Sequence, residues 1–119
     1  MTRGQIEAAI TTAITQFERD HLGRGPREAR TFVIQDLVVV RLRGILSPAE
    51  QQVSTEPGGA ALIKEVRSRL VESARDQLVG FVEAHAGVPV VSMHTDISTR
   101  TGERVFVFAL AEDLEARLD

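Results

Sequence analysis

Residues 30–43 have the sequence Arg-Thr-Phe-Val-Ile-Gln-Asp-Leu-Val-Val-Val-Arg-Leu-Arg, and this stretch decides the fold class. It is rich in β-branched residues, which favour extended backbone, and only the polar pair Gln35 and Asp36 interrupts it. The pattern predicts two short strands joined by a tight turn at that pair. Because the turn lacks glycine, one long strand with a bulge is the alternative. Side chains alternate along a strand, so one face of the second strand carries Val38, Val40 and Leu42.

The segment before this hairpin has the period of a helix with one apolar face. We expect a helix from Gly4 to Leu22, because apolar residues recur every three or four positions, at Ile6, Ile10, Ile14 and Phe17. We place Glu18 off that stripe, with the polar residues. Thr2 and Gln5 have the spacing of a capping box, and Gly23 is suited to end the helix.

Two helices are predicted after the hairpin. Ser47, Pro48 and Glu50 have the pattern of a capped helix start, and that short helix ends near Ser54. A long helix is expected at roughly 59–86, with an apolar stripe formed by Leu62, Val66, Leu70, Ala74, Leu78 and Phe81. At ~1.5 Å per residue it would be near 40 Å long, so we expect it to kink or to extend onto a partner.

The last part of the chain has the pattern of a second hairpin. The strand expected at 90–97 alternates, with one face formed by Val91, Met93, Thr95 and Ile97. A polar loop at 98–103 leads to a strand at 105–110 that is apolar on both faces, and a polar helix follows from Glu112.

These elements predict an α+β fold. Two hairpins separated by helices suit a two-layer sandwich, with a four-stranded antiparallel or mixed sheet and one long and several shorter helices on one face. The last strand carries Phe106, Phe108 and Leu110 on one side and Val105 and Val107 on the other. So few helices are not expected to cover all of these, which predicts a homodimer.

Composition bounds the function. The chain has 119 residues, of which 43% are hydrophobic, and we expect a single domain over 1–119. The net charge of −3 argues against a general nucleic-acid binder, and the absence of cysteine excludes disulfides, thiolate nucleophiles and Cys-ligated metals. No apolar run approaches the ~20 residues that span a bilayer, and the start does not have the pattern of a signal peptide. We therefore expect a cytoplasmic protein without direct membrane insertion.

Three groups of residues could carry chemistry. The first is the strand face with Ser92, His94 and Asp96, where the imidazole could act as an oriented general base, helped by Arg41 and Arg43 from a neighbouring strand. An ordinary solvated sheet face is the favoured interpretation, because catalytic triads are assembled from separate segments. No catalytic residue is therefore assigned.

The second group is the loop at 23–27 with Arg24 and Arg27, and Arg30 close behind. Exposed backbone N–H groups and guanidinium forks suit a phosphate, carboxylate or bicarbonate. A helix end followed by a solvated turn also explains both glycines, and that interpretation is favoured. Taken together, the candidate ligand-binding residues are Arg24, Arg27, Arg41, Arg43, His94, Asp96 and Arg100.

The third group is the run of hydroxyl and carboxylate residues at 95–104, whose oxygens could bind Mg²⁺ or Na⁺. Hairpin turns use the same residues to bond to themselves, and that interpretation is favoured. The three histidines, His21, His85 and His94, lie in unrelated segments without metal-ligand spacing. No metal site and no cofactor are predicted.

Four blocks of the sequence, at 23–26, 29–44, 46–51 and 94–108, resemble the MpsC-like family. This bacterial domain family, formerly of unknown function, is named for a Na⁺-translocating membrane-potential-generating system. The resemblance implies a small cytoplasmic accessory protein linked to a membrane system related to NADH-dehydrogenase-like ion translocators and inorganic-carbon uptake. It carries over no catalytic residues.

Two hypotheses follow. The first is a non-catalytic accessory or regulatory subunit that docks on a membrane complex as a homodimer, through its sheet face or its long helix. The second is a small-anion or nucleotide binding domain, with or without enzymatic activity, that uses the surface arginines and His94. The accessory subunit is favoured over the binding domain, and enzymatic activity is not favoured.

Overall fold

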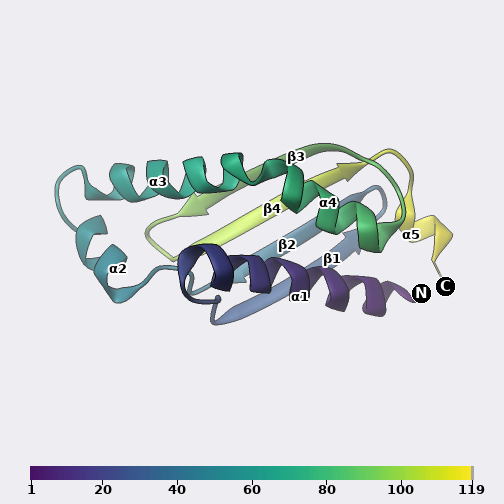
Figure 1. Ribbon diagram of the computed structural model, residues 1–119, viewed down its shortest axis with the longest axis horizontal. Helices are drawn as coiled ribbons and strands as arrows, with labels where there is room; N and C mark the ends of the chain where they lie inside the picture. Colours follow the sequence, from purple (N-terminus) through teal and green to yellow (C-terminus); the bar gives the residue numbers. More distant parts are fainter. Residues whose placement is uncertain (119) are drawn as a thin grey trace.

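The computed structural model describes residues 1–118 (Figure 1). The elements in chain order are α1 (Arg3–Leu22), β1 (Glu28–Ile34), β2 (Leu37–Arg43), α2 (Pro48–Ser54), α3 (Gly59–Ser73), α4 (Arg75–Ala86), β3 (Val90–Ser98), β4 (Glu103–Leu110) and α5 (Leu114–Arg117). The last helix begins slightly later than predicted, because Asp113 caps it by accepting a hydrogen bond from the Ala116 N–H.

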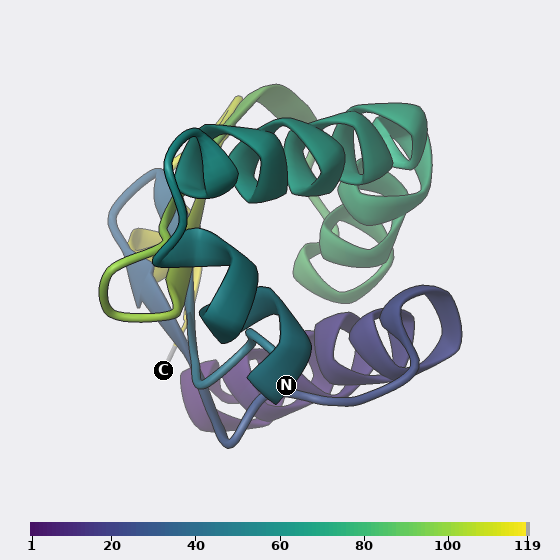
Figure 2. The ribbon, with the colours of Figure 1, turned by 90° about the vertical axis from the view of Figure 1, so that its left-hand side faces the viewer.

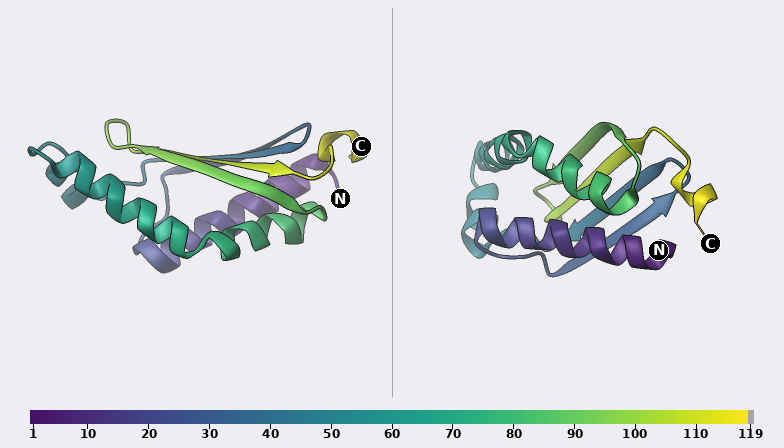
Figure 3. Two further views of the ribbon diagram at one scale, coloured as in Figure 1. Left: turned by 90° about the horizontal axis from the view of Figure 1, so that it is seen from above. Right: turned by 45° about the vertical axis from the view of Figure 1, so that its right-hand side comes forward.

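The four strands form one antiparallel sheet in the order β1-β2-β4-β3. The two hairpins therefore meet through β2 and β4, where Val39 lies opposite Val107. Seen from above, helices α1, α3 and α4 lie on one side of the sheet and leave the other face open (Figure 3). This arrangement confirms the predicted α+β sandwich.

The turn predicted in the first hairpin is present. Gln35 has a positive φ of 55°, which a two-residue hairpin turn requires, and β1 and β2 pair directly on either side of it. The second hairpin holds this turn in place, because Asp36 O accepts a hydrogen bond of 2.8 Å from the Leu110 N–H.

Helix α1 begins and ends as its sequence predicts. Thr2 and Gln5 form both hydrogen bonds of the capping box, and Gly23 ends the helix at φ 80°. One prediction was wrong: Glu18 is buried, with 1% of its surface exposed. It lies one turn beyond Ile14 and so continues the apolar stripe instead of facing solvent.

The predicted long helix is kinked. It breaks at Ala74, whose φ of −108° and ψ of 11° lie outside the helical range, and α3 and α4 meet there. The stripe expected on its first half was wrong, because Leu62 and Val66 are 58% and 49% exposed while Arg67 is 4% exposed. Together with α2, which packs against it, the start of α3 extends beyond the end of the sheet (Figure 1), and both helices lie nearest the viewer in the end-on view (Figure 2).

The core lies between the sheet and the helices. Phe106 and Phe108 are fully buried and Leu110 is 4% exposed. The expectation that these side chains lack cover was therefore wrong, because α1 packs against both β1 and α4 and closes the layer over them. The opposite side of β4, with Val105 and Val107, is only half-buried.

Strands β1 and β3 form the two edges of the sheet. The register of β3 shifts between Val90 and Ser92, so Val91 occupies a bulge and is 70% exposed. The predicted alternation placed it on one face with Met93 and Ile97, which are buried, and this was wrong for Val91. A glutamate binds a backbone N–H of each edge strand at 2.8 Å: Glu7 binds that of Val33, and Glu83 binds that of Val90.

Candidate functional site

Five of the predicted ligand-binding residues gather at one end of the sheet. There the loop after α1, the end of β2 and the turn between β3 and β4 meet around a cavity of about 210 Å³ lined by Arg24, Arg27 and Arg100. A neighbouring hollow of about 340 Å³ is lined by Arg27, Arg41 and Arg43. The pairing of β2 with β4 brings these segments together, although they are up to 76 positions apart.

Two of these arginines are already neutralised. Arg41 Nε lies 2.6 Å from Glu103 Oε2, and Arg43 lies 3.5 Å from Glu103 and 3.8 Å from Glu28. The hydrogen bond from Arg41 lowers the pKa of Glu103. Arg41 and Arg43 therefore have carboxylate partners within the chain.

His94 and Asp96 lie away from this cavity, on the open face of β3. Ser92 Oγ is 2.9 Å from His94 Nε2, but Asp96 binds Lys64 Nζ of α3 at 2.9 Å and the Ile97 N–H at 2.8 Å. The hydrogen bond from Lys64 lowers the pKa of Asp96. The aspartate is thus held by a lysine, and the geometry does not orient it as the partner of the imidazole.

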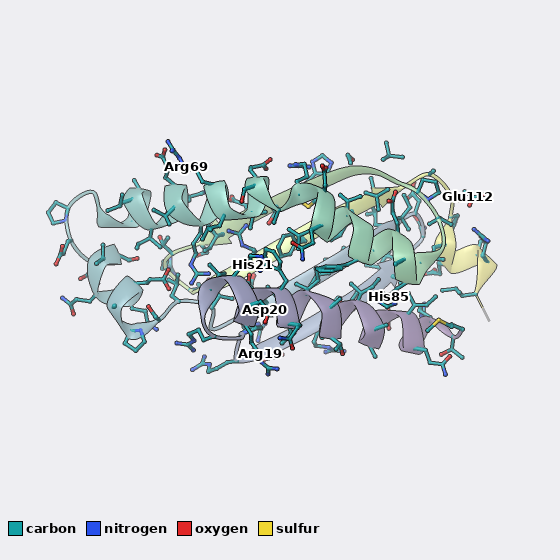
Figure 4. All side chains as sticks on the ribbon, viewed as in Figure 1. Arg19, Asp20, His21, Arg69, His85 and Glu112 are labelled. Atoms are coloured by element: carbon teal, nitrogen blue, oxygen red, sulfur yellow. The ribbon has the colours of Figure 1, made fainter. Side chains whose placement is uncertain are left out.

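The hydroxyl groups of Thr95 and Ser98 bond within the second hairpin, whereas the carboxylates of Asp96 and Glu103 pair with cations outside it. The Thr95 hydroxyl donates to Val105 O and accepts from Arg104, and Ser98 Oγ accepts from the Thr101 N–H. His21 and His85 lie apart on different helices (Figure 4). Within residues 1–118, no group of three or more His, Asp or Glu side chains is placed to hold a metal ion.

A buried charge network lies between the helices and the sheet, and the sequence analysis missed it. Arg67 of α3 binds Glu50 of α2 through two hydrogen bonds of 2.8 and 2.7 Å and donates to Ile45 O at 2.9 Å. Its Nη1 lies 4.0 Å from Glu18 of α1. Arg104 of β4, 2% exposed, is the second buried cation nearby. The network ties α1, α2 and α3 to one another and to the segment that follows β2.

The pKa values of the two glutamates of this network are shifted in opposite directions, one by burial and the other by pairing with arginine. Burial raises the pKa of Glu18, although the arginines oppose the shift. The hydrogen bond from Arg67 lowers the pKa of Glu50 to about 2. Within the described chain, Glu18 Oε2 and Arg104 Nη2 are buried without a hydrogen-bond partner. The spacing of Ile6, Ile10 and Ile14 could have identified Glu18, since it continues that stripe.

No helix among the described residues combines the length and apolar character needed to cross a bilayer. The structure thus defines an antiparallel α+β sandwich with an arginine-lined cavity at one end and a buried charge network at its centre.

Comparison with known proteins identifies the family. Residues 2–112 match the family model described as "Na+-translocating membrane potential-generating system (MpsC)", so the chain belongs to the MpsC family. It is 46% identical to the uncharacterized protein YbcI of Bacillus subtilis (strain 168) over 99% of this chain and 95% of that protein. The uncharacterized protein YrhF of the same strain is 24% identical over 86% of this chain and 84% of its own length. No solved structure matches the chain.

Proposed function

We propose that this protein is a non-catalytic accessory or regulatory subunit of a membrane ion-translocating system, linked to inorganic-carbon uptake, and that it binds a protein of that system from the cytoplasmic side. The family description supports the link to a Na⁺ membrane-potential system. The observation that carries the proposal is the projecting part of α3, which presents apolar side chains that no other element of the described chain covers.

The binding surface on α3 is a short ridge formed by Leu62 and Val66. These residues are four positions apart, so they lie on the same side of the helix, and about half of each is exposed. On the helix surface, Glu65 and Arg69 form an ion pair of 2.8 Å with each other. An apolar pair on a projecting helix is the usual means by which a helix docks into a groove of another protein.

The first prediction tests this ridge. In a pull-down from gently solubilised membranes of the source organism, the wild-type protein should retain a subunit of an ion-translocating complex. Leu62→Gln with Val66→Gln should lower its recovery by about tenfold or more, because burial of each side chain contributes roughly 1–2 kcal/mol.

The matched control is Glu65→Gln with Arg69→Gln, which makes two substitutions on the same helix and should leave recovery unchanged. Equal recovery with both double variants would exclude the ridge as the docking surface. Retention of no membrane protein, in a preparation where known complexes survive, would exclude the accessory role.

We further propose that a second copy of the chain covers the open face of the sheet. The centre of this face is apolar, with half-buried Phe32, Val39 and Val107 and with Ile34 48% exposed. The strand register places Phe32, Val39, Val107 and His94 in one row across the sheet. The next row contains Arg30, Arg41, Val105 and Asp96.

These rows are self-complementary about a two-fold axis that runs along the strands. Such an axis places β1 of one copy over β3 of the other, since these strands are the two edges. Arg30 then faces Asp96 of the second copy, and Val39 faces Val107. The two ion pairs lie at the ends of this row, where Arg41 keeps Glu103 as its partner, and the adjacent row supplies the apolar contact of Phe32, Val39 and Val107. Apolar contacts beside complementary charges are typical of protein interfaces.

The second prediction is that light scattering gives the mass of a dimer at micromolar concentration. Arg30→Asp should weaken the dimer by ~10-fold or more, because it places like charges opposite each other. The exchange Arg30→Asp with Asp96→Arg should restore the dimer, and Arg117→Asp, outside this face, should not affect it. A monomeric wild type, or an Arg30→Asp variant that stays fully dimeric, would contradict the proposed interface.

The second candidate function, small-anion binding, is favoured by one observation, the convergence of Arg24, Arg27 and Arg100 on one cavity. His94 lies outside this cavity, so the anion-binding site proposed here consists of the arginines without His94.

A further inference from the structure

The arginine-lined cavity differs from the rest of the surface in its charge. Among the described residues that line it, Arg24, Arg27 and Arg100 are cationic and none is acidic. The remaining lining residues are small, amide-bearing or hydroxyl-bearing, apart from one leucine: Gly44, Leu46, Gln51, Thr99, Thr101 and Gly102. The cavity thus combines three positive charges with hydrogen-bonding groups.

The three cavity arginines have few hydrogen-bond or ion-pair partners among the described residues. Within residues 1–118, Arg27 and Arg100 make no side-chain hydrogen bond or ion pair, and Arg24 donates only two long hydrogen bonds, of 3.4 Å, to Gly44 O and Leu46 O. By contrast, Arg41 and Arg43 in the adjacent hollow have Glu103 as their partner. Three guanidinium groups that share one cavity repel each other unless an anion lies between them.

The frame of the cavity is fixed by backbone contacts. The Ile45 N–H binds Gly102 O at 3.1 Å, which joins the end of β2 to the turn between β3 and β4. The Arg27 N–H binds Arg43 O at 2.9 Å. Gly44, at φ 67°, lets Arg27 pack directly over it, since a Cβ there would lie 2.8 Å from Arg27 Cβ and Nε. The Arg27 side chain is therefore held against the rim before any ligand binds.

We propose that this cavity binds a phosphate group, as inorganic phosphate or as the terminal group of a small phosphate monoester. Guanidinium forks match tetrahedral oxyanions with paired N–H donors, and three of them suit a dianion better than a monoanion. The volume of about 210 Å³ suits a small ligand. Because none of the described lining residues is aromatic, the cavity offers no platform for stacking a nucleotide base.

This inference does not depend on the accessory role, because it concerns the isolated protein. It specifies the small-anion function further, by naming one site, one class of ligand and the three side chains that bind it.

The third prediction is a calorimetric titration of the purified protein with inorganic phosphate at constant ionic strength. The wild type should bind phosphate, and Arg27→Gln or Arg100→Gln should each weaken binding by ~10-fold or more, because each removes a charge-assisted hydrogen-bond donor. Arg117→Gln, which removes an equal charge outside the cavity, should bind within twofold of the wild type. Sodium bicarbonate and sodium chloride, as monoanion controls, should bind more weakly.

A second readout separates binding from general charge effects. Without phosphate and at low salt, the Arg27→Gln variant should melt at a higher temperature than the wild type, because the substitution relieves repulsion among the three arginines. With phosphate present, the variant should melt at a lower temperature than the wild type, because only the wild type gains the full stabilisation from binding. Absence of phosphate binding by the wild type, or equal loss with Arg27→Gln and Arg117→Gln, would overturn the proposal. Equal binding of chloride would show only a nonspecific ion atmosphere and would also overturn it.

Discussion

Arg67→Ala should lower the free energy of unfolding by about 3–5 kcal/mol, the cost of breaking a buried ion pair by removing one partner. The substitution deletes the hydrogen bonds to Glu50 and Ile45 and leaves Glu18 buried without its nearest cation. Urea denaturation followed by circular dichroism, at one protein concentration, measures the loss. Arg69→Ala, two positions along the same helix, should have little effect because its ion pair is exposed.

The pH dependence of this variant follows from Glu18. Burial already raises its folded-state pKa above the value of 4.5, so its charged form opposes folding, and this penalty grows as pH rises through the folded pKa. Without Arg67 the penalty increases. The deficit of Arg67→Ala should therefore be larger at pH 7 than at pH 5, and Glu18→Gln should recover part of it. A loss equal to that of Arg69→Ala would show that the network does not support the fold.

Gly59→Ala should destabilise the junction of α2 and α3 by about 3 kcal/mol, at the upper end of typical overpacking costs. An added Cβ would lie 1.7 Å from the carbonyl oxygen of Val53, so the backbone itself must move. The same urea titration measures this effect.

Gly80→Ala is the matched control for this variant. Gly80 lies within α4 with no heavy atom within 4 Å of an added Cβ. This substitution should stabilise the protein by roughly 0.5–1 kcal/mol, because alanine favours the helix. If the two variants shifted stability in the same direction, the close contact at Gly59 would not be the cause.

Much of the fold could be predicted from local signals. The capping box at Thr2 and the turn at Gln35 depend on residues close in sequence, and both are confirmed. A kink was one of two outcomes expected from the length of the long helix, and only the structure places it at Ala74. Strand alternation and helical period were sufficient to assign an α+β sandwich. The order of the strands within the sheet depends on contacts between the hairpins, and local patterns do not contain that information.

The errors at Glu18, Leu62 and Val66 share one physical cause. Whether a charged side chain is buried depends on a partner that is distant in sequence: Arg67 is 4% exposed because Glu50 and Glu18 neutralise it. Once Arg67 occupies the inner side of α3, Leu62 and Val66 are turned outward. A hydrophobic stripe alone therefore assigned the wrong side of this helix to the core.

The sequence indicated which kinds of residue form the candidate site, but not which of the candidates lie together. The seven candidate residues included all three cavity arginines. Arg24 and Arg27 were chosen because a glycine-rich loop with arginines suggests an anion site, and Arg100 came from the polar loop of the second hairpin. The pairing of β2 with β4 decides which of the seven share the cavity: Arg24, Arg27 and Arg100 line it, and His94 and Asp96 do not. The neutralisation of Arg41 by Glu103 likewise depends on that pairing.

The bulge at Val91 protects the sheet from uncontrolled growth. Edge strands present unpaired backbone N–H and C=O groups, to which a strand of another molecule can hydrogen-bond. Such pairing is the first step toward fibrils. In β3 the bulge interrupts that template, and the Glu83 carboxylate binds the Val90 N–H. At the other margin Glu7 does the same for Val33 of β1. Both margins of the sheet therefore resist strand addition, which favours closed assemblies over open-ended polymers.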